Sequence, residues 1–257
     1  MTILITGGGG NLGRELVKIY SESLHPSHSE LDVCDAGSVY EYVRVAKPDQ
    51  LMHCAALIGI KQCDQDKERA YSTNVQGTRN LVRAVLRYCP NCLFVYISTA
   101  SVFYGDLGNY SESDVPNPRN FYSLTKLLGE FVVSESALTN YVIIRTNLVA
   151  RERWSYPKAF TDRYGTYLFA DDLANAIKHV VDLGLRGIVH VCGEKLSMFE
   201  LAKITTPDIL PMTMSEYTGP PLPVDMSLRS IRIQSFPLTR KKREAVGSSS
   251  AQVRCTR

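Results

Sequence analysis

A glycine-rich turn near the N-terminus constrains the fold of this chain more than any other stretch. Residues 2–6 read as a short apolar strand that runs into four consecutive glycines and then into an amphipathic helix. In a nucleotide-binding turn, one glycine permits the tight turn off the strand, a second lets backbone N–H groups approach a pyrophosphate, and a third lets the helix pack closely on the sheet. These positions are Gly7, Gly10 and Gly13. Although the glycines alone are compatible with a flexible loop, the flanking strand and helix favour a dinucleotide site at the helix N-terminus.

The order of apolar runs beyond this turn predicts the fold class. Short apolar runs alternate with amphipathic segments to about residue 205, which indicates an α/β protein of the Rossmann type, a doubly wound parallel sheet with helices on both faces. Prolines become frequent after that point, and we expect a small C-terminal substrate-binding portion. We expect a dinucleotide-binding domain with the catalytic residues at 1–147, a mixed region with substrate-binding elements and a further sheet strand at 148–239, and a flexible tail at 240–257.

The composition excludes several classes of partner. With 29 basic and 26 acidic residues, the net charge of +3 is too balanced to indicate binding to nucleic acid or to a membrane. No run approaches the roughly 20 apolar residues of a membrane span, and residues 1–20 do not resemble a signal peptide, so we expect a cytoplasmic protein. The 7 cysteines are scattered and odd in number, which predicts reduced thiols and no metal site. The oligomeric state stays open, with a homodimer as one option.

The polar segment after the first helix bears on the choice of cofactor. It is short, so we expect any second strand there to be brief. In this fold the end of the second strand meets the adenosine ribose, where an acidic side chain favours NAD and basic or hydroxyl side chains admit the 2′-phosphate of NADP. Ser27, His28 and Ser29 lie near that point, and Glu30 and Asp32 follow. Either NADP or NAD fits this pattern, and NADPH is slightly preferred.

The strand predicted to begin at Gln50 ends in the small side chains of Cys54, Ala55 and Ala56. Small side chains at the carboxyl end of a strand leave room for a cofactor, and tight packing of a helix on the sheet explains them equally well. His53, inside the apolar run, is interpreted as a hydrogen-bonded core residue.

Three further residues have the order and spacing of a hydride-transfer site. Thr99 follows an apolar strand, and Tyr122 and Lys126 share one face of a predicted helix because they are four residues apart. A tyrosine has a pKa near 10, which must fall by about three units for proton exchange near neutrality. A neighbouring lysine ammonium favours the phenolate, and Thr99 can hold the substrate oxygen by a hydrogen bond. Alone, the Tyr-x-x-x-Lys pair is better explained as an ordinary exposed helix pair, but its position after the glycine turn and Thr99 favours catalysis.

These motifs together resemble the dTDP-4-dehydrorhamnose reductase family, nucleotide-sugar reductases among the extended short-chain dehydrogenases/reductases. The resemblance covers most of the chain. The similar stretches are residues 5–16, 29–33, 54–56, 73–78, 98–103, 117–130, 145–146, 171–174 and 222–228.

The resemblance implies a Thr99, Tyr122 and Lys126 catalytic triad, with hydride delivered from the nicotinamide to the 4-keto carbon of the sugar. It also implies that Lys126 binds the nicotinamide ribose and that Asn74 lines the site and relays protons. The residues expected to bind the cofactor are Gly7, Gly10, Asn11, Leu12, Gly13, Asp32, Val33, Cys54, Ala55, Ala56, Asn74, Tyr122 and Lys126.

The chain departs from the family pattern where the sugar is expected to bind. Asn147 and Leu148 stand where these reductases usually carry Ser-Trp, so the tryptophan expected to touch the sugar is absent. The basic and aromatic residues just beyond, including Arg153 and Trp154, have the chemistry to clamp a pyrophosphate and stack on a base. A surface loop with a partly buried aromatic cluster is the alternative. Thr99, Asn147, Arg153 and Trp154 are the residues expected to bind the substrate.

These observations favour an NAD(P)H-dependent reductase of a nucleotide-linked 4-keto-6-deoxysugar. A nucleotide-sugar epimerase and a non-catalytic NADP-binding regulatory subunit are the alternatives. A 4,6-dehydratase fits less well, because such enzymes need Asp-Glu directly after the threonine and this chain has Ala100 and Ser101.

Overall fold

A computed structural model describes residues 1–239, and the tail predicted at 240–257 lies outside the described residues. The core is a five-stranded, fully parallel sheet in the order β1-β2-β3-β4-β9. The predicted Rossmann-type parallel sheet is therefore confirmed. Its strands are β1 (Ile3–Thr6), β2 (Gln50–His53), β3 (Leu93–Ile97), β4 (Tyr141–Arg145) and β9 (Gly187–His190).

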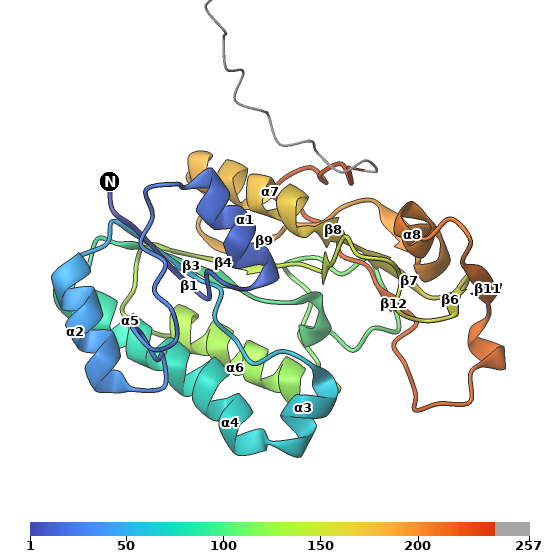
Figure 1. The fold of residues 1–257 in the computed structure, drawn as a ribbon, viewed down its shortest axis with the longest axis horizontal. Coiled ribbons are helices and arrows are strands. Elements are labelled where there is room, and N and C mark those ends of the chain that lie inside the picture. The colour runs from blue at the N-terminus through green and yellow to red at the C-terminus, as the bar shows by residue number, and fades with distance from the viewer. Residues whose placement is uncertain (240–257) are drawn as a thin grey trace, which may run out of the picture.

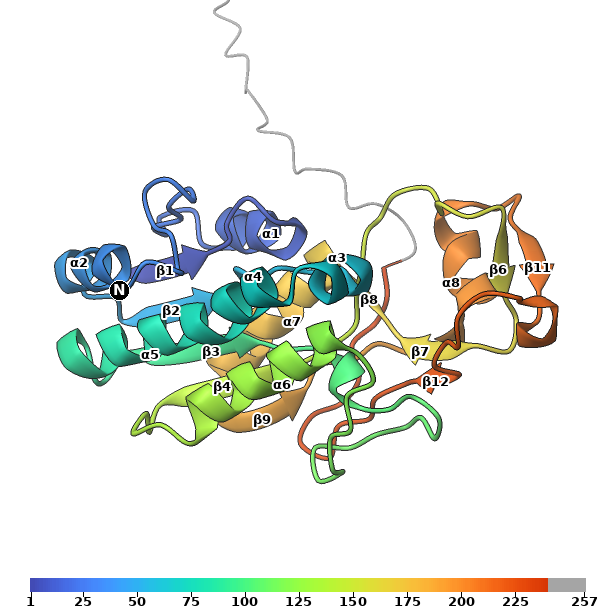
Figure 2. The same ribbon diagram turned by 90° about the horizontal axis from the view of Figure 1, so that it is seen from below.

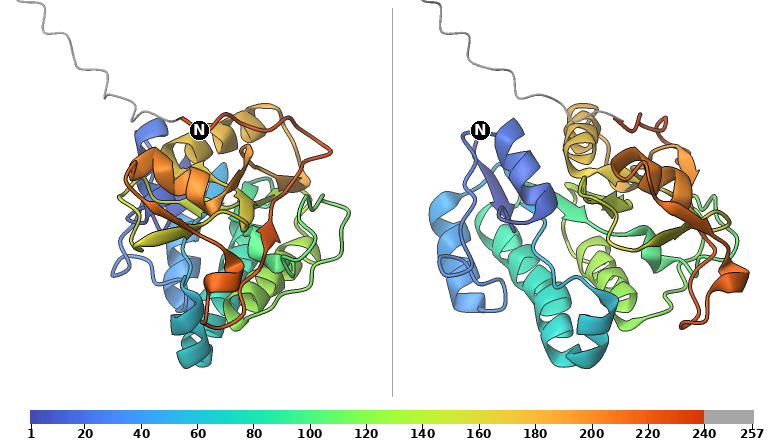
Figure 3. Two further views of the ribbon diagram at one scale, coloured as in Figure 1. Left: turned by 90° about the vertical axis from the view of Figure 1, so that its right-hand side faces the viewer. Right: turned by 45° about the vertical axis from the view of Figure 1, so that its right-hand side comes forward.

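Helices cover both faces of this sheet. Figure 1 shows α1 and α7 on one side and α2, α5 and α6 on the other, and the two layers stay apart when the molecule is turned (Figure 3). Alternate strand residues feed two separate apolar clusters, because successive side chains of a strand point to opposite faces. The helices of the two layers are α1 (Asn11–Ile19), α7 (Ala170–Asp182), α2 (Ala36–Ala46), α5 (Gly77–Tyr88) and α6 (Phe121–Ser134).

The second strand of the usual Rossmann pattern is reduced to one contact. Leu24 forms a single parallel bridge with Leu4, and no strand is assigned between β1 and β2 in the described chain. Residues 25–30, which follow, are mostly polar and exposed, and the next apolar side chains, Leu31 and Val33, are buried in the cluster beneath α2 and α5 without forming a strand. The expectation of a brief second strand is confirmed.

The helical stretch that leads up to Tyr88 is interrupted. α3 (Ile60–Gln65) precedes α4 (Lys67–Tyr71), which continues through a π-helical turn, Ser72–Gln76, into α5. At the junction, a Cβ on Gly77 would lie 2.8 Å from Val33 Cγ2, so the glycine permits a close approach of the helix to the segment that carries Val33.

A smaller lobe gathers at the end of the molecule beyond the carboxyl ends of the strands (Figures 1 and 2). It is built mainly from the chain after residue 147, although α7 and β9 of this part return to the main sheet. In the described part of the chain, no helix is long and apolar enough to cross a membrane. The remaining elements are β5 (Leu148–Val149), β6 (Lys158–Phe160), β7 (Tyr164–Thr166), β8 (Leu168–Phe169), β10 (Lys195–Ser197), α8 (Met198–Thr205), β11 (Leu210–Met212), β12 (Asp225–Met226) and the 3₁₀ turns Ala100–Val102 and Met214–Glu216.

Candidate active site and cofactor cleft

The glycine turn leaves no room for side chains at its fingerprint positions. Gly7 has a φ of +72°, and a Cβ there would lie 2.6 Å from the backbone nitrogen of Ala55. A Cβ on Gly13 would lie 2.1 Å from the carbonyl oxygen of Gly7. Gly10 donates its N–H to that same oxygen at 3.0 Å and begins α1 as its N-cap. The turn therefore packs against the strand ends as a nucleotide-binding turn requires.

The two spacer glycines differ from each other. A Cβ on Gly8 would lie 2.9 Å from Cβ of His25, whereas a Cβ on Gly9 would meet nothing within 4 Å. Gly8 is therefore needed because the segment after α1 crosses the turn closely, a contact that the sequence does not reveal. Gly9 is open on its outer side.

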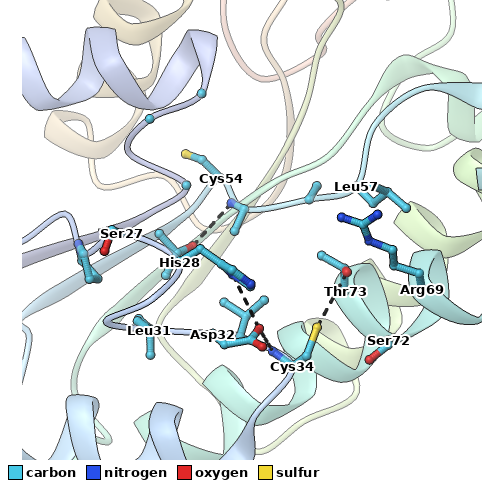
Figure 4. Close-up of a pocket in the computed structure, with 18 of the residues that line it drawn as sticks. Ser27, His28, Leu31, Asp32, Cys34, Cys54, Leu57, Arg69, Ser72 and Thr73 are labelled. Carbon is cyan, nitrogen blue, oxygen red and sulfur yellow. Dashed lines mark hydrogen bonds and ion pairs between the residues drawn. The ribbon is translucent and has the colours of Figure 1, made fainter. Parts of the chain in front are cut away.

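A cleft of about 1020 Å³ opens over the carboxyl ends of β1 and β2 (Figure 4). Asn11 is the first residue of α1 at its edge, and Leu12 and Gly13 are buried beneath the turn, so Leu12 belongs to the core and does not line the cleft. Of the residues predicted to bind the cofactor, those that line the cleft are Gly7, Gly10, Asp32, Val33, Cys54, Ala55 and Ala56.

The side of the cleft nearest the predicted ribose site is polar, but most of its polar groups bond to one another. Ser27 donates both its backbone N–H and its hydroxyl to the carboxylate of Glu30, at 2.8 Å each. His28 Nδ1 lies 3.8 Å from a carboxylate oxygen of Asp32, which also accepts the backbone N–H of Cys34. This side thus presents one imidazole and no lysine or arginine among the described lining residues.

The side chains of Tyr122, in the first turn of α6, and of Thr99, just after β3, contact each other, although neither residue is among those that line the cleft. Burial raises the pKa of Tyr122 to about 12, the nearby thiol of Cys63 adds to this rise, and a hydrogen bond with the side chain of Thr99 opposes it. The lowered phenol pKa expected from the Tyr-x-x-x-Lys spacing is therefore wrong for this state of the site, because desolvation outweighs the other effects. The phenol is fully protonated near neutrality.

Lys126 is buried, with 4% of its surface exposed, and its Nζ lies 4.1 Å from the ring centroid of Tyr96. Burial lowers the pKa of the amine to about 8, while the negative field of Glu130 partly offsets this effect. A lysine with such a pKa exchanges protons near neutrality. It also disfavours charge on a neighbour, since burial and Lys126 together lower the pKa of His53 to about 3.

His53 is a core residue, as interpreted from the sequence. Its Nδ1 is 2.8 Å from the hydroxyl of Thr6, and its Nε2 is 3.1 Å from the hydroxyl of Thr78. Both ring nitrogens thus have partners in the core, and His53 does not line the cleft.

Asn74 is held in the structure by three hydrogen bonds. Its side-chain amide accepts from the N–H of Leu57 at 2.8 Å and donates to the carbonyl of Leu57 at 3.0 Å and to the hydroxyl of Thr125 at 2.9 Å. The residue is buried and is not among the described residues that line the cleft, so its contact with the cofactor and its part in proton relay stay predictions. It fixes the loop after β2 to helix α6, and the Thr125 hydroxyl in turn donates to the carbonyl of Tyr122 at 2.7 Å.

The predicted substrate clamp is also not formed. Arg153 pairs with Asp208 at 2.6 Å on the exposed surface, and the indole N–H of Trp154 donates to the carbonyl of Lys158 at 3.3 Å. Trp154 packs on the apolar cluster around α8, so the alternative of an aromatic cluster beneath a surface loop is the better description. The partner aspartate lies 55 residues away in the chain, and the local pattern therefore did not reveal it.

The side chain of Asn147 forms a hydrogen bond within the smaller lobe. Its side-chain amide donates to the backbone carbonyl of Met226 at 3.0 Å, which joins the end of β4 to the returning C-terminal segment. This bond leaves only part of the Asn147 side chain available to a substrate.

Three residues near the site were not anticipated. Asp64 accepts the backbone N–H of Phe121 at 3.3 Å, at the start of the helix that carries Tyr122, and Cys63 lies beside the phenol. Arg69 extends into the cleft from α4. Their positions depend on how α3 and α4 pack, and the only signal in the sequence is that these charged and thiol side chains follow a strand end.

The comparisons with known proteins agree with this arrangement. Residues 1–217 match the model of a family described as the RmlD substrate binding domain. A dTDP-4-dehydrorhamnose reductase of Aggregatibacter actinomycetemcomitans is 34% identical over 134 residues, which cover 50% of this chain and 45% of that protein. The chain thus spans about half the length of this relative.

Two other similarities extend over nearly the whole chain. The β subunit of methionine adenosyltransferase 2 from Bos taurus is 24% identical over 95% of this chain and 85% of that protein. The crystal structure of dTDP-4-dehydrorhamnose reductase from Bacillus anthracis in complex with NADP superposes with a TM-score of 0.79, at 27% identity, over 89% of this chain and 90% of that one.

Proposed function

This chain belongs to the RmlD substrate binding domain family, that of the dTDP-4-dehydrorhamnose reductases, and from this premise we propose that it is an NAD(P)-dependent oxidoreductase that reduces a nucleotide-linked 4-keto-6-deoxysugar. The observation that carries the proposal is the contact between the side chains of Thr99 and Tyr122, together with Lys126, whose charge acts on Cys54 in the wall of the cleft lined by the glycine turn. This arrangement supports a hydride-transfer site in which the catalytic residues adjoin the cofactor.

The cofactor proposed is NADP or NAD. Its fit rests on the turn itself, where side chains at Gly7 and Gly13 would collide with backbone and where α1 begins at the cleft. The backbone N–H groups at this N-terminus suit a pyrophosphate. When bound, the nicotinamide supplies the hydride that reduces the sugar carbonyl. Reductase relatives of this chain include one solved with NADP.

The proton that completes the reduction comes from Tyr122. A pKa of about 12 keeps its hydroxyl protonated near neutrality, so the residue acts as an acid toward the alkoxide that forms at C4. Thr99 holds the same oxygen by a hydrogen bond. Lys126, buried on the same helix face with a pKa of about 8, stabilises the phenolate left behind and binds the nicotinamide ribose.

The positioning of Tyr122 depends on contacts outside the reacting groups. Asn120 caps α6 by accepting the N–H of Ser123 at 2.9 Å, and Thr125 and Asn74 tie the first turn to the cofactor wall. We also assign residues 1–147 to cofactor binding and catalysis and residues 148–239 mainly to the substrate, with Asn147 at their junction.

Replacement of Tyr122 with phenylalanine tests this function. The variant is expected to lose about 10²- to 10⁴-fold in kcat, the usual contribution of a positioned acid, and to keep its cofactor affinity. The assay supplies a panel of nucleotide-linked 4-keto sugars and follows NADPH or NADH absorbance, with Tyr156→Phe, an exposed tyrosine, as the control. Full turnover by Tyr122→Phe would show that the phenol is not the acid.

An epimerase is the first alternative, since it oxidises and re-reduces the same carbon without net use of the cofactor. Net consumption of NADPH or NADH during turnover separates the two reactions.

A regulatory subunit is the second alternative, and the match with the methionine adenosyltransferase β subunit over 95% of the chain favours considering it. It predicts cofactor binding without turnover on any sugar of the panel, together with stable co-purification with a partner enzyme. Size-exclusion chromatography of the purified chain also separates a monomer from a homodimer.

A further inference from the structure

Among the described residues that line the cofactor cleft, Arg69 is the single lysine or arginine. It lies in α4, on the wall that faces Ser27 and His28 across the cleft, and its guanidinium extends toward Leu57 (Figure 4). Within residues 1–239, its guanidinium has no hydrogen-bond or ion-pair partner, and the bonds of Arg69 are those of its backbone, whose N–H donates to Asp66 and whose carbonyl accepts from Ser72. The guanidinium is therefore available to a ligand.

Two hydroxyl groups accompany this guanidinium. Ser72 and Thr73 follow Arg69 by three and four residues, a spacing that places side chains on one helix face, and both line the cleft. The Thr73 hydroxyl makes only a weak contact, 3.7 Å, with the sulfur of Cys34. The α4 wall thus presents a planar guanidinium with two hydroxyl donors, the donor set that proteins use for phosphate groups.

The guanidinium of Arg69 is important because the carboxylates that line the cleft would repel a phosphate. Asp32, Asp66 and Glu68 also line the cleft, so its carboxylates outnumber its fixed cation. The glycine turn contributes only N–H dipoles, and a dinucleotide brings at least two negative charges. Arg69 is thus the one fixed positive charge among the described lining residues that can offset the charge of these phosphates.

We propose that Arg69, with Ser72 and Thr73, binds a phosphate group of the adenosine half of the dinucleotide. This inference rests on the proposed function, because it names a binding residue for the same cofactor. Two phosphates have this chemistry, the 5′-pyrophosphate and the 2′-phosphate of NADP. The first makes Arg69 important for NADH and NADPH alike, and the second only for NADPH.

Direct binding measurements on the full chain test the proposal without reference to turnover. Isothermal titration with NADPH, NADH and adenosine is compared between the wild type, Arg69→Ala, Arg69→Lys and Arg83→Ala, an exposed arginine of α5 that does not line the cleft. Arg69→Ala is expected to weaken NADPH binding by about ten- to a hundredfold, the usual effect of losing a charge-assisted hydrogen bond. Arg69→Lys recovers part of this loss, and Arg83→Ala binds like the wild type.

The pattern across ligands separates the outcomes. An equal loss for NADH and NADPH identifies the pyrophosphate, and a loss confined to NADPH identifies the 2′-phosphate. An equal loss for adenosine shows that Arg69 stacks on the base and overturns the proposal, as does unchanged binding of both dinucleotides to Arg69→Ala. Wild-type binding of NADPH without turnover of any keto sugar counts against the proposed function alone.

Discussion

Lys126 and Arg145 are both buried beside the carboxylate of Glu130, yet they meet different environments. Arg145 Nη2 lies 2.7 Å from Glu130 Oε2, and both side chains of this pair are 3% exposed. Lys126 has no carboxylate within ion-pair distance in the described structure, and its amine rests on the ring of Tyr96. Burial lowers the pKa of Lys126 to about 8. Glu130 thus neutralises Arg145, which joins α6 to β4, and leaves Lys126 without a paired carboxylate and able to titrate.

This difference distinguishes Arg145, whose charge supports the structure, from Lys126, whose charge serves the chemistry of the site. The Glu130–Arg145 pair joins α6 to β4 beneath the site, and Ser98 at the end of β3 donates a further hydrogen bond to Glu130. A buried pair of this kind fixes geometry. An uncompensated buried lysine costs stability, which is typical of groups retained for their chemistry.

The largest effect is expected when Glu130 is removed. Glu130→Ala leaves Arg145 charged, buried and unpaired, and should lower the free energy of unfolding by about 3–5 kcal/mol. Urea denaturation measures this loss, with the exposed Glu135→Ala of the same helix as the control. If the variant does not fold, Glu130→Leu combined with Arg145→Met should fold, because it removes both charges. A loss no larger than that of the control would mean that the pair is not needed for stability.

Replacing Lys126 should raise the free energy of unfolding, whereas removing Glu130 lowers it. A shift of the pKa from 10.5 to about 8 corresponds to a cost of up to about 3 kcal/mol, at 1.36 kcal/mol per pKa unit. Lys126→Met should therefore raise the free energy of unfolding at pH 7 while it abolishes turnover, whereas Arg145→Met should lower it. Urea denaturation and the sugar assay measure the two properties, with the exposed Lys61→Met as the control. A destabilised Lys126→Met would show that the buried ammonium is compensated after all.

The smallest predicted effect is the change in the free energy of unfolding, per pH unit, that results from the titration of Lys126. Between pH 8 and 10.5 the unfolded chain keeps the proton of Lys126 and the folded chain releases it, so stability rises with pH across this window. Below pH 8 both states are protonated and the cost is complete. The gain of Lys126→Met over the wild type should therefore shrink by up to about 1.4 kcal/mol per pH unit. Parallel urea titrations at pH 7, 8.5 and 10 measure this, and a constant gap would contradict it.

Local patterns predicted those parts of the molecule that depend on neighbouring residues. Strand and helix periodicity located the sheet, the brief second strand followed from its polar residues, and the four-residue spacing put Tyr122 and Lys126 on one helix. The roles of Gly7 and Gly13 also followed, because a turn between a strand and a helix limits space in a known way.

Features that depend on distant partners could not be predicted in this way. The side-chain amide of Asn74 bonds to Leu57 and Thr125, and Arg153 pairs with Asp208, and neither set of partners could be predicted from the local sequence. The pKa of Tyr122 depends on how deeply the site is buried, which spacing does not reveal. The same packing turns Arg69 into the cleft.

The π-helical turn at Ser72–Gln76 makes the site sensitive to the length of the chain as well as to its composition. A π turn accommodates one residue more than an α-helix over the same path. Deleting one residue within it would restore a regular helix over that path, so α4 with Arg69 and α5 would keep their places. The change would fall within the turn itself, where the side chain of Asn74 bonds to Leu57 and Thr125. A lineage that lost this single residue would keep its sheet, both apolar clusters and Arg69, yet would need a new way to hold the loop after β2 against α6.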